Sequence, residues 1–154
     1  MSAPPHRSIV SPVPSSDVRS WCTPREPDLG LRSIGNSTGI GVFVLPNASV
    51  FAIEHRSDQG AILINQILGS PLDGGIGRIL MRVGGANPSN IDALGSRAKV
   101  RLGVGHNRIA WEGVTNGIAH RVTLLLIPGQ TTWLWRVEAI NTGDAAVPVD
   151  AILI

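Results

Sequence analysis

Three apolar runs that follow one another, 108–112, 118–127 and 132–140, constrain the fold more than any other feature of the chain. Asn116-Gly117 separates the first two runs, and Pro128-Gly129 separates the last two. Asn-Gly readily adopts the positive φ angles of a tight hairpin turn, and Pro-Gly also marks a turn. Apolar runs of this length between such turns predict a β-meander.

A fourth apolar run begins at Val147 and continues to Ile154, where the sequence stops. A strand that ends without polar residues or a turn leaves backbone groups and apolar side chains exposed. We therefore expect the chain to be a piece of a longer protein, and its fold to be incomplete at the C-terminal end.

Length and composition favour a single domain of short strands. The chain has 154 residues, 43% of them hydrophobic, which is enough to bury one sizeable core. Its 18 Gly and 11 Pro, with only 16% charged residues, disfavour long helices. We predict an all-β fold, an antiparallel β-sandwich formed by residues 29–154. Residues 1–28, rich in Pro, Ser and Arg, are expected to form a flexible leader.

Alternation and turn residues place the other strands. The segment 35–39, Gly-Asn-Ser-Thr-Gly, predicts a hairpin turn rather than a phosphate-binding loop, because no Lys and no helix follow it. One helical turn is expected over 90–94. In the third meander run, Trp133 and Trp135 share the face that we expect to enter the core. Further strands are predicted at 40–45, 50–55, 61–68, 78–83 and 99–104.

Charge and cysteine content exclude several classes of partner. A formal net charge of +2, with acids interspersed among the bases, provides no electrostatic footprint for nucleic acid. No apolar run approaches the roughly 20 residues of a membrane span, and the N-terminus lacks the apolar core of a signal peptide. The single Cys22 excludes an internal disulfide. We therefore expect a cytoplasmic protein with no nucleic-acid or membrane partner.

The polar residues form no recognisable catalytic or metal-binding motif. The acids are spaced singly, so most are expected to be solvated. The four histidines lack the close spacing of zinc ligands, and no Gly-x-Ser-x-Gly elbow occurs. We predict no catalytic residue, no metal site and no cofactor.

Tryptophan is the residue type with two open interpretations. Trp111, Trp133 and Trp135 are expected on neighbouring strands, where an exposed indole can stack on a sugar ring. Alternatively, indole rings fill the space between two sheets while the N–H group finds a carbonyl. Burial in the core is favoured for Trp133 and Trp135, and both interpretations stay open for Trp111.

Several segments occur in an order and spacing that point to a known family: 33–36, 62–75, 79–82, 110–113, 117–123 and 133–144. In this order they resemble the N-terminal β-sandwich of 1,2-β-oligoglucan phosphorylases, which belong to the cellobiose phosphorylase-like superfamily, glycoside hydrolase family 94. The resemblance covers roughly residues 29–154. It implies a galactose mutarotase-like super-sandwich that precedes a helical linker and a catalytic (α/α)6 barrel.

The resemblance also implies a function. The parent family would phosphorolyse β-1,2-glucooligosaccharides with inorganic phosphate as co-substrate, using residues on the barrel. The present chain would then be catalytically inert and would support the barrel and its carbohydrate cleft. Its expected partners are a β-glucan oligosaccharide or the barrel, with self-association through unpaired strand edges. The candidate carbohydrate contacts are Trp111, Asn65 and Arg82.

Two alternatives remain beside this one. The first is a stand-alone carbohydrate-binding β-sandwich. The second, weaker alternative is an aldose-1-epimerase-like enzyme, in which His120 with Glu112 or Glu138 would supply the acid and base.

Overall fold

A computed structural model describes residues 18–22, 30–64 and 75–154, and all regular elements within them are β-strands. The strands run antiparallel to their neighbours, which confirms the predicted all-β sandwich. Within these residues no helix is long and apolar enough to cross a bilayer. The elements are β1 Val18–Cys22, β2 Arg32–Gly35, β3 Ile40–Val44, β4 Val50–Ser57, β5 Gly60–Leu63, β6 Ile79–Val83, β7 Ser89–Leu94, β8 Arg101–Gly105, β9 Arg108–Thr115, β10 Ile118–Leu126, β11 Trp133–Asn141 and β12 Val149–Leu153.

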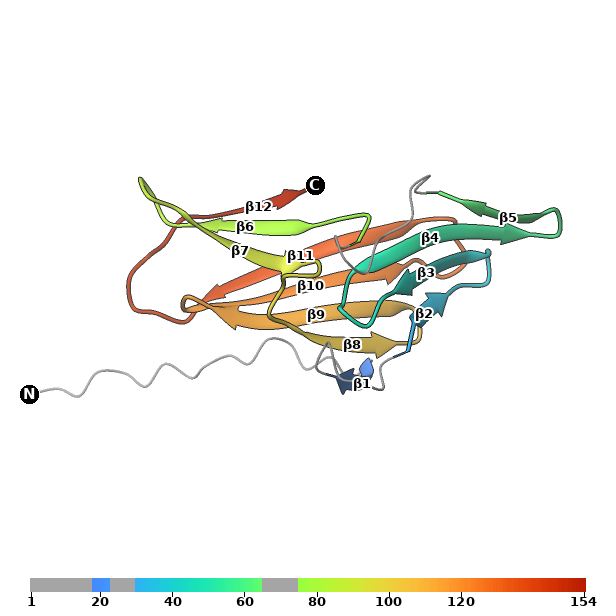
Figure 1. The fold of residues 1–154 in the computed structure, drawn as a ribbon, viewed down its shortest axis with the longest axis horizontal. Coiled ribbons are helices and arrows are strands. Elements are labelled where there is room, and N and C mark those ends of the chain that lie inside the picture. The colour runs from blue at the N-terminus through green and yellow to red at the C-terminus, as the bar shows by residue number, and fades with distance from the viewer. Residues whose placement is uncertain (1–17, 23–29, 65–74) are drawn as a thin grey trace, which may run out of the picture.

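The strands form three sheets in two layers (Figure 1). One layer is a five-stranded sheet in the order β1-β8-β9-β10-β11. The other layer contains a three-stranded sheet, β12-β6-β7, and a four-stranded sheet, β2-β3-β4-β5. Buried apolar side chains from all three sheets belong to one core cluster between the layers. The three sheets therefore share a single hydrophobic core.

The meander predicted from the sequence is β9, β10 and β11, the last three strands of the five-stranded sheet. Asn116 and Gly117 join β9 to β10 with φ angles of 51° and 75°, the positive values that a two-residue hairpin turn needs. This turn fixes the register, so that Glu112 lies opposite Arg121 and Trp111 opposite Val122. The local sequence therefore determines which side chains face the core.

The second hairpin expected from the sequence, at 36–39, is also present between β2 and β3. Its polar side chains dock on the turn between β10 and β11. The Asn36 amide nitrogen donates to the carbonyl oxygens of Ile127 and Gln130 at 3.1 and 2.9 Å, and the Thr38 hydroxyl donates to that of Gln130 at 3.0 Å. These bonds connect one layer to the end of the other.

Two segments differ from their predictions. The helical turn expected over 90–94 is wrong, because Ser89–Leu94 forms β7 with the alternating pattern of Ile91 and Ala93 buried and Asp92 less so. Part of the predicted leader is also ordered, since Val18–Cys22 pairs with β8 as β1. The strand expected at 61–68 is described only as β5, Gly60–Leu63, and residues 65–68 lie outside the described residues.

Trp111 occupies the centre of the core. Its side chain is fully buried, and its indole nitrogen donates a 2.8 Å hydrogen bond to the carbonyl oxygen of Ala48, in the turn between β3 and β4. The ring centroid of Trp135 on β11 lies 5.9 Å away. Ala48 has a φ of 66°, a left-handed conformation that non-glycine residues adopt at some energetic cost. One side chain thus bonds the two layers together, and the core interpretation of Trp111 is the one that the structure supports.

We expect replacement of Trp111 by Phe to lower the free energy of unfolding by about 2 kcal/mol, because the buried carbonyl of Ala48 loses its donor. The measurement is urea-induced unfolding followed by circular dichroism. Trp133→Phe is the matched control, since Trp133 is only half-buried. An equal or larger loss in the Trp133 variant would contradict the special role of the interlayer bond.

Candidate functional site

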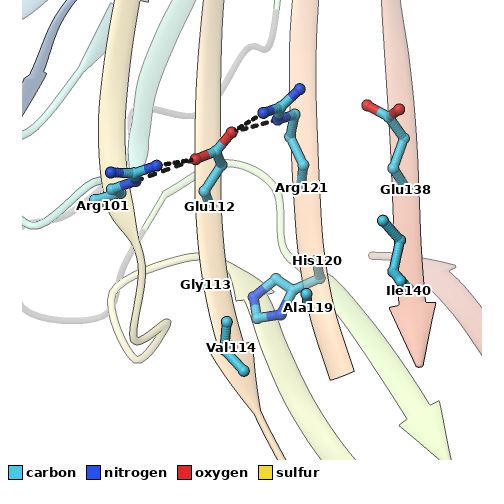
Figure 2. A pocket seen from close by; sticks show the side chains of 9 residues that line it. All are labelled: Arg101, Glu112, Gly113, Val114, Ala119, His120, Arg121, Glu138 and Ile140. Carbon is cyan, nitrogen blue, oxygen red and sulfur yellow. Dashed lines mark hydrogen bonds and ion pairs between the residues drawn. The ribbon is translucent and has the colours of Figure 1, made fainter. Parts of the chain in front are cut away.

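A row of charged side chains crosses the outer face of the five-stranded sheet (Figure 2). The ladder places Arg101 on β8 opposite Glu112 on β9, Glu112 opposite Arg121 on β10, and Arg121 opposite Glu138 on β11. Their charges alternate along the row. Because directly opposed residues of antiparallel strands project from the same face, four sequence-distant residues become neighbours.

Glu112 is the centre of this row. Its Oε2 accepts two hydrogen bonds from the guanidinium of Arg101, at 2.8 and 3.1 Å, and its Oε1 accepts from the guanidinium of Arg121. The side chains of Glu112 and Arg121 are each only 10% exposed, whereas that of Arg101 is 60% exposed. Both carboxylate oxygens are therefore already engaged, which suits a structural clamp across three strands better than a reactive acid.

The charged row is extended by an aromatic side chain from β1. Trp21 lies opposite Gly103 on β8, and the Arg101 guanidinium carbon sits 4.6 Å from the centroid of the Trp21 ring. A guanidinium over an indole face is attracted by the ring quadrupole. This contact ties β1, from the predicted leader, to the sheet.

A shallow cavity of about 430 Å³ lies beside the row and is also lined by Val114, Ala119 and Ile140. Gly113 and His120 border it as well. A Cβ atom at Gly113 would lie 2.9 Å from the His120 ring and 2.6 Å from the Lys99 carbonyl oxygen, so no larger residue fits there without a shift. The close packing of the imidazole on β9 depends on this glycine.

His120 is a buried polar side chain. It is 4% exposed, and neither ring nitrogen has a hydrogen-bond partner of normal geometry among the described residues. Burial lowers the pKa of His120 below its usual 6.5, and the nearby backbone of Ile118 opposes this only in part. The imidazole is therefore held in its neutral form.

The acid and base of the epimerase alternative do not come together. His120 lies opposite Gly113 in the ladder, so its side chain projects to the interior, while Glu112 and Glu138 project to the outer face with Arg121. The alternation of a β-strand separates them, and that pairing was wrong.

The three candidate carbohydrate contacts are dispersed. The Trp111 ring is fully buried and presents no face for stacking. Arg82 lies on β6 in the other layer, where its guanidinium binds the Asp150 carboxylate at 2.6 and 3.1 Å. Asn65 lies outside the described residues. The described structure therefore brings none of these side chains together.

The candidate site contains residues that the sequence reasoning missed, Arg101 and Arg121. The two-residue turn at Asn116-Gly117 already implied that Glu112 faces Arg121, and this signal was not used. Within the described ranges, no group of three or more His, Cys, Asp or Glu side chains gathers as a metal site would require. The cations and carboxylates are instead paired with one another.

A family model described as the SOGP N-terminal domain matches residues 43–154 of this chain. No curated protein matches the chain. The matched family is this domain and not a glycoside hydrolase family 94 phosphorylase domain, so the assignment to that phosphorylase family is corrected. The functions that it implied, phosphorolysis of β-1,2-glucooligosaccharides and support of a carbohydrate cleft, are withdrawn with it. The separate carbohydrate-binding alternative is withdrawn as well, because the family match does not indicate such a role and the Trp111 ring is buried.

Replacing Glu112 by Gln is expected to lower the free energy of unfolding by about 3 kcal/mol, since the buried Arg121 and the more exposed Arg101 would both lose the ionised carboxylate that accepts their hydrogen bonds. Asp150→Asn is the matched control, because the Arg82–Asp150 pair is 51% and 60% exposed and should contribute less than about 1 kcal/mol. Chemical denaturation of both variants measures the difference. Equal losses of unfolding free energy in the two variants would contradict a stabilising role for the buried contacts of Glu112.

Acidification should destabilise the fold through His120. The unfolded chain binds a proton near pH 6.5, whereas the folded pKa is lower, so stability is fully present above pH 6.5 and is lost as the pH falls below it. His120→Phe should remove this part of the pH dependence in urea unfolding. His106→Gln, at an exposed position, should retain it. If the free energy of unfolding of the His120 variant still falls with decreasing pH as it does in the unmodified chain, another group causes the pH dependence.

Proposed function

Since the chain belongs to the SOGP N-terminal domain family, we propose that this domain is an assembly module that docks on another folded protein through one side of the sandwich. That side, called the open side below, consists of β11, β12 and Ile154. The single observation that carries the proposal is the concentration of exposed large apolar side chains there: Leu134, Val137, Ile140, Val149, Ile152, Leu153 and Ile154.

The open side is formed by two edge strands. β11 has only β10 as a neighbour and β12 has only β6, among the strands of residues 18–22, 30–64 and 75–154. An edge strand presents unpaired N–H and C=O groups, which proteins commonly protect with charged side chains, above all lysine, with proline or with a bulge. β11 contains no lysine or proline, its two charged residues, Arg136 and Glu138, have opposite signs, and its pairing with β10 is regular over nine residues. Such an edge accepts another strand.

An apolar cavity lies between the two edges. It measures about 340 Å³, and its lining includes Trp133 and Trp135 from β11, Leu153 and Ile154 at the end of β12, and Val50 and Ile53 from β4. Trp133 and Trp135 pack against the core and are half-buried, as their predicted core role requires. An apolar hollow next to exposed apolar edges is typical of protein docking sites.

We also propose that the domain is cytoplasmic. The support is compositional, because the sequence contains a single cysteine, Cys22, and one cysteine cannot form a disulfide within the chain.

The test is a photo-activated crosslinking amino acid placed at Leu134, which is 52% exposed on the open side, in the cell that makes the protein. The expected result is a covalent adduct with a protein at this position. The matched control is the same amino acid at Ile62 on β5, which is 65% exposed but outside the open side. Equal or absent adducts at the two positions would overturn the proposal.

A further inference from the structure

β11 has a backbone edge that fits a second copy of this chain, and we propose that two copies pair there through antiparallel β11 strands, with Val137 on the two-fold axis. This inference rests on the proposed docking role of the open side and names its partner. The pair would join two five-stranded sheets into one continuous sheet.

The backbone of β11 is suited to this pairing. Its residues from Trp133 to Asn141 pair with β10 without a bulge, so the strand follows a regular ladder. No strand in the part of the chain that the structure describes pairs with its other edge. A regular edge presents alternating donors and acceptors that match the same edge turned by 180°.

The charges of β11 select one register for the pair. A two-fold axis perpendicular to the sheet places outer-face residues of one copy opposite outer-face residues of the other. With Val137 opposite itself, Arg136 of each copy lies opposite Glu138 of the other. A shift by one alternation would place either Arg136 or Glu138 opposite itself, and like charges directly opposite destabilise a sheet. The charge pattern is therefore self-complementary in one register.

The apolar residues agree with the same register. Leu134 and Ile140, which are 52% and 40% exposed, lie opposite each other on the outer face. On the inner face the large Trp135 lies opposite the small Ala139. Opposed Cβ atoms in antiparallel strands are about 5 Å apart, so these side chains would contact and bury each other. Association would thus cover apolar surface that is exposed in the single copy.

Arg136 needs little rearrangement to reach the second copy. Within one chain its guanidinium contacts the Glu138 carboxylate at 2.9 Å, and its side chain is 69% exposed. Redirecting such a side chain across the axis exchanges one ion pair for an equivalent one and disrupts no packing. In the pair, the Glu138 carboxylate of the second copy accepts the hydrogen bond that Arg136 donates.

The experiment is analytical ultracentrifugation of the purified 154-residue chain over a wide range of concentration. The unmodified chain is expected to show a reversible monomer–dimer equilibrium. Arg136→Glu should raise the dimer dissociation constant by about tenfold or more, because carboxylates then oppose each other at both symmetry-related positions. Glu138→Arg should do the same with guanidinium groups. The double variant Arg136→Glu with Glu138→Arg restores opposite charges and should recover the original dissociation constant.

Arg56→Glu is the matched control, because Arg56 also pairs with an acid two residues away, Glu54, but on β4. It should leave the dimer unchanged, and circular dichroism spectra should show the same β-sheet content for all dimer variants at the temperature of the ultracentrifugation. A chain that stays monomeric, or a double variant that fails to recover, overturns the second-copy proposal. In either of these cases, crosslinking from Leu134 to a different protein would still support the docking role. Failure of the second-copy proposal is therefore distinguishable from failure of the docking proposal.

Discussion

The hydrogen bond between the Trp111 indole and the Ala48 carbonyl holds the two layers in position at the centre of the core. It links the middle of the five-stranded sheet to the turn between β3 and β4, so the four-stranded sheet has a fixed position above it. The surrounding apolar contacts are non-directional and would tolerate sliding, whereas this bond has one donor and one acceptor. Ala48 has a left-handed backbone conformation, and the hydrogen bond that its buried carbonyl accepts helps to offset the energetic cost of that conformation.

Different interactions stabilise the two faces of the five-stranded sheet. The inner face excludes water with indole and aliphatic groups, and even its histidine is kept neutral there. The outer face carries an alternating row in which Glu112 receives hydrogen bonds from two guanidinium groups. A buried carboxylate needs such partners because its desolvation is otherwise costly. The row connects β8, β9 and β10, and Trp21 adds β1 through Arg101.

Much of the fold was predictable, because hairpin turns act over a few residues. Asn116-Gly117 fixed the pairing of β9 with β10, and alternation placed Trp133 and Trp135 toward the core. The prediction failed at Ser89–Leu94, because its three buried apolar residues, Ile91, Ala93 and Leu94, do not alternate strictly with polar ones, and so short a pattern does not distinguish a strand from a helical turn. Val18–Cys22 lacked any periodic signal, because its order comes from pairing with β8, 80 residues later in the chain.

The candidate site, like the fold, was only partly predictable from the sequence. The sequence by itself determined the meander of β9, β10 and β11, its turns and the opposition of Glu112 and Arg121, because a two-residue turn transmits register directly to its flanking strands. Only the tertiary structure decided that Arg101 completes that pair, that Trp111 is buried rather than exposed, and that the apolar edges of β11 and β12 border one cavity. These features depend on the packing of strands far apart in the chain, and long-range packing follows from the sum of many weak contacts rather than from any local pattern.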